Sequence, residues 1–203
     1  KEDLESGTRA ALMGGVTSIL EMPNTSPNTT DAITLQDKLN RAAGRAWSNC
    51  GFFIGASTEN AAQLGELEQL PGCPGIKIFM GSSTGSLLVS AEDDLRKVLQ
   101  NGTRPCPIHA EDEPRNRARK SLISEEPTAR EHPFLRDSES AIMATRQILR
   151  LSKETGRPVH VLHISTKEEP WIIDEARKAG VRATSEVTPQ HLFFAGPECY
   201  DRL

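Results

Sequence analysis

Six short apolar runs, separated by longer stretches with helical spacing, dominate the pattern of hydrophobic and polar positions along the chain. Most of these runs are rich in Val, Ile and Phe and have Gly or Pro close by, as is typical of buried strands. The predicted strands are Val16–Met22, Cys50–Ala56, Gly75–Met80, Pro105–Ala110, Pro158–Ser165 and Arg182–Val187.

The stretches between these runs have the spacing of amphipathic helices. The clearest is Ser138–Thr155, whose apolar stripe ends at Gly156. Thr30 or Asp31 is a candidate N-cap for a helix over Ala32–Ala46. Further helices are predicted over Leu4–Met13, Glu59–Leu70, Ala91–Gln100, Arg115–Ile123 and Lys167–Ala179, whereas Ser124–Asp137 is predicted to be an irregular loop beside the site.

This alternation of strands and helices predicts a parallel sheet with right-handed crossovers. Two architectures fit the pattern, an open doubly wound sheet and part of a (β/α)8 barrel. No G-x-G-x-x-G sequence follows the first predicted strand, so the nucleotide-binding forms of the open sheet are poorly supported. We expect residues 1–203 to form a single domain.

Composition narrows the class of protein. The 203 residues are 36% hydrophobic and 26% charged with a net charge of −4, which excludes a disordered chain and gives no basic footprint for nucleic acid. No apolar run reaches the roughly 20 residues of a membrane-spanning helix, and no secretory leader opens the chain, so we expect a cytoplasmic protein. Without close pairs of cysteines, we expect reduced thiols at Cys50, Cys73, Cys106 and Cys199.

Three ionisable residues interrupt the apolar strands near their C-terminal ends, where parallel α/β folds carry their active sites. The first is Lys77. A buried lysine has a lowered pKa, so its neutral amine can form a Schiff base, act as a base or take up carbon dioxide as a carbamate. The alternative is a lysine that extends to the rim and pairs with a carboxylate.

The other two are His109 and His163, which are candidate metal ligands or hydrogen-bonded core residues. His160 competes with His163, because alternation along a strand puts the two on opposite faces and does not say which one faces inward. No role is assigned to His132 or His191.

Five pieces of sequence, in order, carry a family resemblance. They are Met22-Pro23-Asn24-Thr25, Gly75-Ile76-Lys77-Ile78-Phe79-Met80-Gly81, His109-Ala110-Glu111-Asp112, His163-Ile164-Ser165-Thr166 and Glu186-Val187-Thr188-Pro189. Together they resemble a dihydroorotase of the amidohydrolase superfamily over essentially the whole chain. The Met-Pro-Asn-Thr piece separates dihydroorotases best from allantoinases and hydantoinases.

The resemblance implies a (β/α)8 barrel, here about six βα units of it and incomplete at both ends. It also implies two divalent metal ions, usually Zn²⁺, held by a carbamate on Lys77 and by His109 and His163. Asn24 would bind the substrate's carboxylate; the alternative is a turn residue that caps the loop between Pro23 and Pro27. The His-x-His pair of the first strand and the general-base Asp of the last strand would lie outside this sequence, the Asp beyond Leu203.

The implied activity is metal-dependent hydrolysis of a cyclic amide, which interconverts N-carbamoyl-L-aspartate and L-dihydroorotate in pyrimidine biosynthesis. The alternatives are a hydantoinase- or allantoinase-like cyclic amidase and a non-catalytic subunit that scaffolds a partner. The implied partners are the small-molecule substrate, a second copy in a homodimer or aspartate transcarbamoylase. We expect the 203 residues alone to be inactive, because six strands cannot close an eight-stranded barrel.

Overall fold

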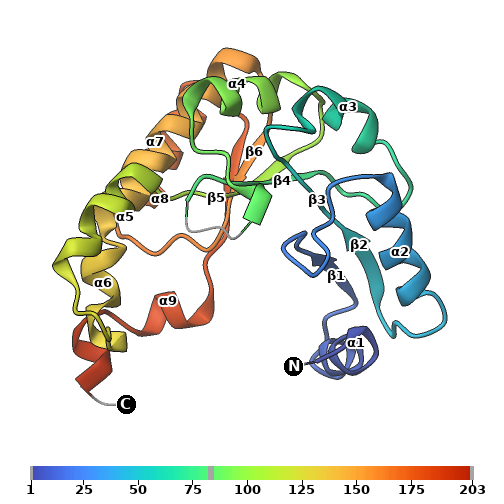
Figure 1. The fold of residues 1–203 in the computed structure, drawn as a ribbon, viewed down its shortest axis with the longest axis horizontal. Helices are drawn as coiled ribbons and strands as arrows, with labels where there is room; N and C mark the ends of the chain where they lie inside the picture. Colours follow the sequence, from blue (N-terminus) through green and yellow to red (C-terminus); the bar gives the residue numbers. More distant parts are fainter. Residues whose placement is uncertain (1, 82–84, 202–203) are drawn as a thin grey trace.

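The computed structural model describes residues 2–81 and 85–201, which form a curved layer of parallel strands with helices along its outer side (Figure 1). The strands are β1 (Ser18–Glu21), β2 (Asn49–Phe52), β3 (Ile54–Gly55), β4 (Ile76–Phe79), β5 (Cys106–His109), β6 (Val159–Val161) and β7 (Ala183–Ser185). They follow the order β1-β2 in one sheet and β3-β4-β5-β6-β7 in another, and every pair is parallel.

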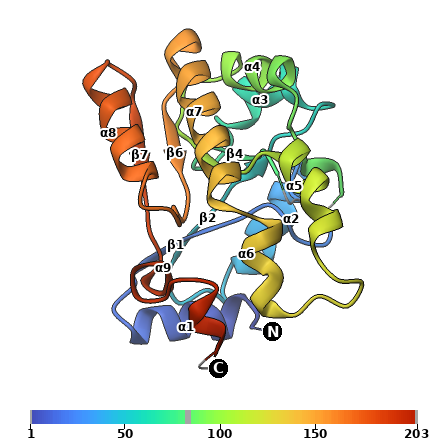
Figure 2. The same ribbon diagram turned by 90° about the vertical axis from the view of Figure 1, so that its left-hand side faces the viewer.

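The second predicted strand changes its neighbour at Phe53. The amide of Phe53 donates to the carbonyl of Glu21 at the end of β1, whereas the amide of Ile54 donates to the carbonyl of Gly75 before β4. One continuous run therefore belongs to both sheets, as β2 on one side of Phe53 and β3 on the other. The ribbon curves as an arch, and both termini lie at its open side (Figures 1 and 2).

Each of the seven predicted helical stretches contains a helix, and the first two begin with the same local signal. Asp3 and Asp31 each accept a hydrogen bond from the backbone three residues on, which caps α1 (Leu4–Met13) and α2 (Ala32–Ala42). The others are α3 (Leu64–Leu67), α4 (Glu92–Gln100), α5 (Glu113–Arg119), α7 (Ser138–Thr155) and α8 (Glu169–Lys178).

Two short helices lie where none was predicted. The supposed irregular loop over residues 124–137 contains a 3-10 turn, Ala129–Glu131, followed by α6 (His132–Leu135). The side chain of Glu131 accepts hydrogen bonds from the backbone amides of Ser124 and Thr128, which ties this segment together. After β7 the chain forms α9 (Pro189–Phe193).

A single apolar core lies between the sheet and the helices. It includes Ile76 and Ile78 of β4, Ile108 of β5 and Val159 of β6, packed against leucine, isoleucine and valine side chains of α4, α7 and α8. The four cysteines are free, as predicted, and Cys73 and Cys106 are buried. In the described part of the chain, no helix has both the length and the apolar character required to cross a membrane.

A buried ion pair fastens the N-terminal edge of the sheet. Arg157, just before β6, pairs with Glu68, just after α3, and the two side chains are 1% and 0% exposed. The Glu68 carboxylate also accepts from the backbone amides of Thr103 and Arg104, which precede β5. This edge lies opposite the C-terminal ends of the strands, so it supports the fold rather than the site.

Candidate active site

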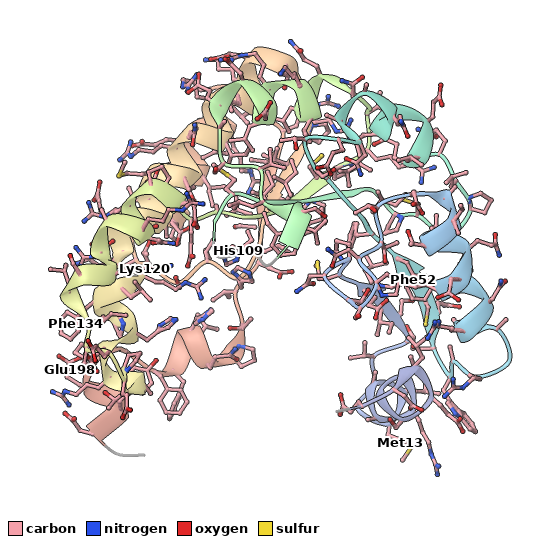
Figure 3. The ribbon with its side chains drawn as sticks, viewed as in Figure 1. Met13, Phe52, His109, Lys120, Phe134 and Glu198 are labelled. Carbon is pink, nitrogen blue, oxygen red and sulfur yellow. The ribbon has the colours of Figure 1, made fainter. Side chains whose placement is uncertain are left out.

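The sheet face turned away from the helices, which we call the inner face, carries polar side chains. Ile76 and Ile78 lie in the core, so Lys77 between them belongs to the inner face. His109 pairs in register with Phe79 on the neighbouring strand. Figure 3 shows His109 on the concave side of the arch.

Lys77 is buried and positioned by its own strand. Its side chain is among the largest that are fully buried, its Nζ donates to the carbonyl of Ile78 at 2.6 Å, and Nζ lies 3.7 Å from the centre of the Phe79 ring. Desolvation lowers the pKa of Lys77 well below its usual value, opposed only in part by Cys106 and Glu186. Its burial and its lowered pKa favour the chemical interpretation of Lys77 over a lysine that extends to the rim.

His109 and His163 contact each other directly. Nδ1 of His109 lies 3.1 Å from Nε2 of His163, and the two rings meet edge to face. Desolvation, reinforced by the positive charges of His109 and Lys77, lowers the pKa of His163. A neutral imidazole is the form that binds metal ions, so the lowered pKa of His163 is suitable for that role.

The backbone at His163 has an unusual conformation. Its φ is +38°, and it is the one residue other than glycine with positive φ in the described part of the chain. Strained backbone of this kind persists where the surrounding structure holds it and is concentrated at functional sites. The turn at His163 directs its ring towards His109.

The prediction that only one of His160 and His163 could face inward is wrong. The strand was predicted over Pro158–Ser165, but β6 ends at Val161, so strand alternation does not extend to His163. His160 lies between Val159 and Val161, which are both in the core, and its side chain contacts β7 and the residue that follows it. Nδ1 of His160 lies 2.8 Å from the Thr184 hydroxyl, and Nε2 lies 3.2 Å from the Glu186 carboxylate.

Two side chains of opposite charge, Glu111 and Arg136, flank His109, and neither had a role assigned from the sequence. Nε2 of His109 lies 3.4 Å from Oε2 of Glu111 and 3.1 Å from a guanidinium nitrogen of Arg136. Burial raises the pKa of the Glu111 carboxyl, but its hydrogen bonds with His109 and Arg136 outweigh burial and lower that pKa to about 2.

The histidine pair opens into a cleft of about 560 Å³. Besides His109 and His163, its walls include Arg136, Glu169 and His191. Glu169 is buried and accepts from the backbone amides of Ser165 and Thr166, which fixes the loop that follows His163. Lys77 and Asn24 are not among the described side chains that line this cleft.

Asn24 lies apart from the histidines, in the loop that follows β1, and is exposed. That loop is attached to the sheet, because the amide of Thr29 donates to the carbonyl of Pro23 and the amide of Gly55 donates to the carbonyl of Thr29. Asn24 is thereby placed at the C-terminal edge of the strands, on the same edge as His109.

The histidine pair fits a metal ion, and the described residues provide part of a full ligand set. Two nitrogens bound to one tetrahedral zinc ion at about 2.0–2.1 Å lie roughly 3.3 Å apart, close to the 3.1 Å between Nδ1 of His109 and Nε2 of His163. Among the described residues, no three His, Cys, Asp or Glu side chains gather closely enough to hold a metal ion. Any further ligand must come from a group such as a modified Lys77 or from another segment.

Comparison with known proteins gives several clear relatives, although no family model matches the chain. The chain is 33% identical over 199 residues to the multifunctional protein CAD of Squalus acanthias, covering 95% of this chain and 7% of that protein. It is 31% identical over 204 residues to a dihydroorotase of Methanosarcina mazei, covering 96% of this chain and 44% of that protein. It is also 33% identical over 207 residues to an allantoinase of Rubrobacter xylanophilus, covering 95% and 44% of the two chains.

Among solved structures, the L-hydantoinase (dihydropyrimidinase) of Arthrobacter aurescens matches with a TM-score of 0.88 at 24% identity, over 95% of this chain and 44% of that one. This likeness confirms the predicted fold, a partial barrel of the amidohydrolase type. The chain spans less than half the length of these relatives. Over nearly its whole length the chain is therefore similar to part of the proteins named dihydroorotase, and its fold is a partial barrel of the amidohydrolase type.

Proposed function

We propose that the chain supplies part of the active site of a dihydroorotase, which interconverts L-dihydroorotate and N-carbamoyl-L-aspartate in pyrimidine biosynthesis. The observation that carries the proposal is the pair of His109 and His163, with their facing nitrogens 3.1 Å apart, beside the strand that holds the buried Lys77. The relatives named dihydroorotase support this substrate, and enzymes of this family are generally metal-dependent.

In this proposal His109 and His163 hold a divalent metal ion, most simply Zn²⁺, through Nδ1 and Nε2. The amine of Lys77 would add to carbon dioxide with loss of a proton, and the resulting carbamate would provide anionic oxygens as further ligands. Metal ions held by these residues would supply Lewis-acid activation of a water molecule and of the amide carbonyl. Hydrolysis would add the oxygen of water to that carbonyl carbon, break the ring C–N bond and deliver a proton to the leaving nitrogen, a transfer that the resemblance assigns to a general-base Asp.

Asn24 has the role of binding the substrate's carboxylate, since its loop is attached to the same edge of the sheet as His109. We also propose that the protein is cytoplasmic. We further propose that it assembles as a homodimer or with aspartate transcarbamoylase. The similarity to a protein named multifunctional supports the second assembly.

A second candidate is a cyclic amidase for another ring, which the allantoinase relative and the hydantoinase fold both favour. The same residues would act on an amide of a five-membered ring, and Asn24 would then have no substrate carboxylate to bind in the same place. A third candidate, a non-catalytic scaffold, requires that the histidine pair binds no metal.

One experiment separates these candidates. The full-length protein is analysed for metal content, for carbamate density on Lys77 in a crystal structure, and for hydrolysis of dihydroorotate, hydantoin and allantoin. We expect about two divalent ions per chain, a carbamate and a preference for dihydroorotate, all lost in Lys77→Ala and retained in Lys97→Ala on the exposed face of α4. Preference for another ring supports the second candidate, and a metal-free protein with an unmodified Lys77 supports the scaffold.

A further inference from the structure

The nitrogen of His109 that points away from His163 faces two side chains of opposite charge. β5 ends at His109, and Glu111 lies two residues further along the chain. Arg136 directly follows α6. Their side chains approach the same atom, Nε2 of His109, at 3.4 Å for the carboxylate and 3.1 Å for the guanidinium. The exposed fraction of the His109 side chain is only 14%, so this arrangement is largely shielded from water.

Glu111 and Arg136 are also fixed to each other and to their surroundings. The guanidinium of Arg136 binds both carboxylate oxygens of Glu111, with Nη2 at 2.6 Å from Oε1 and Nε at 2.8 Å from Oε2. The side-chain amide of Asn116, on α5, donates to Oε2 of Glu111 at 3.1 Å. Bidentate pairs of this kind hold both partners in one orientation, so the Glu111 carboxylate has a defined position beside the ring.

The hydrogen-bonding groups around His109 determine which of its two ring nitrogens carries the proton. A guanidinium only donates hydrogen bonds, an ionised carboxylate only accepts them, and a neutral imidazole has one donor nitrogen and one acceptor nitrogen. With its proton on Nδ1, His109 donates to Nε2 of His163 and accepts from Arg136. With its proton on Nε2, it donates to Glu111, and the lone pair on Nδ1 is free to bind a cation together with His163.

We propose that the Glu111–Arg136 pair is a positioning element for His109, in which Glu111 accepts the Nε2 proton and so leaves Nδ1 free for a metal ion. Arg136 orients the carboxylate of Glu111. When no metal ion is bound, Arg136 donates a hydrogen bond to Nε2 of His109. The inference rests on the proposed function, because it concerns the same histidine pair. It assigns a role to residues 124–137, since this segment delivers Arg136 to the site.

A carboxylate that accepts from the second nitrogen of a metal-binding histidine typically strengthens metal binding by about 10- to 100-fold. The test is direct binding of Zn²⁺ and Co²⁺ to the full-length protein by titration calorimetry, together with nitrogen NMR of ¹⁵N-labelled histidines. Glu111→Gln and Arg136→Met are compared with the unaltered protein. Glu125→Gln and Arg146→Met, at exposed positions, are the matched controls.

We expect the His109 proton to move from Nδ1 to Nε2 when Zn²⁺ binds to the unaltered protein. We expect Glu111→Gln to weaken binding by about 10- to 100-fold, Arg136→Met to weaken it by a smaller factor, and both controls to bind as the unaltered protein does. The tautomer of His109 is read in the unaltered protein, so this part of the test stands even if a variant fails to fold.

Two results would overturn the inference by itself: unchanged affinity in a folded Glu111→Gln, or zinc-bound His109 with its proton still on Nδ1. A different result, failure of the unaltered protein to bind a divalent ion at His109 and His163, would overturn the proposed function and the inference with it. The two failures are therefore distinguished by the unaltered protein.

Discussion

Gly102 lies so close to Arg157 that a β-carbon at residue 102 would overlap the guanidinium group, and it would also overlap the carboxylate of Glu68. The backbone of Gly102 has φ +118°, a conformation that other residues rarely adopt. The buried ion pair at the N-terminal edge of the sheet therefore depends on the absence of a side chain at this position.

We expect Gly102→Ala to lower the free energy of unfolding by about 2–4 kcal/mol, because it combines backbone strain with overpacking. Gly15→Ala is the matched control, since Gly15 also has positive φ, +86°, but has no atom within 4 Å of its ideal Cβ position. The control should cost only about 1–2 kcal/mol. Urea denaturation of both variants measures the difference, and equal losses would contradict the packing argument.

Removing one member of the buried ion pair should be worse than removing both charges. Arg157→Met leaves the Glu68 carboxylate buried without its partner, and we expect a loss of about 3–5 kcal/mol in the free energy of unfolding. The double variant Glu68→Gln with Arg157→Met should be more stable than Arg157→Met alone, because no unpaired charge remains. A double variant less stable than the single one would show that the carboxylate has another source of stabilisation.

Stability should fall in acid partly because of Glu111. Its pKa is lowered from 4.5 to about 2 in the folded protein, so the unfolded state binds a proton more readily between these values. Its contribution, at most about 3 kcal/mol, is complete above pH 4.5 and is lost as the pH falls towards 2. Denaturation midpoints from pH 6 to pH 2 should show a shallower decline for Glu111→Gln, and parallel curves would refute this assignment.

The backbone at His163 allows its side chain to be removed without a large loss of stability. Asparagine tolerates positive φ better than most residues, so His163→Asn should retain the free energy of unfolding to within about 1 kcal/mol. Its affinity for Co²⁺ should fall at least about 10-fold, because half of the histidine pair is missing. His191→Asn, on the wall of the same cleft, is the control, and equal affinities in the two variants would place the metal site elsewhere.

The centres of the strands could be predicted from the sequence, but not their ends. Each predicted strand overlaps an observed strand, because a strand that is buried under helices needs a run of apolar residues, and Gly or Pro near the run marks the adjoining turn. The end of β6 at Val161 depends on the turn at His163, which is stabilised by contacts with residues far away in the sequence. Periodicity contains no information about such contacts. The prediction that His160 and His163 lie on opposite faces was therefore wrong, because it assumed that the strand continues to His163.

A site residue could be predicted from the sequence where its type differs from that of its neighbours in the chain. Lys77 and His109 stand out as ionisable residues within apolar strands, and the structure places both on the inner face. Arg136 could not be found in this way, because it lies outside the apolar strands, in a segment that was predicted to be an irregular loop. Only the fold brings it to Glu111, 25 positions earlier in the chain.

The order of the strands has a consequence for how the protein is made. In the described part of the chain, every strand pairs only with the strands next to it in sequence. The paired positions of successive strands are 22 to 53 residues apart, so each pairing closes a loop that is much shorter than the chain. Each βα unit can therefore join the growing sheet as it leaves the ribosome, without waiting for a distant segment to be synthesised.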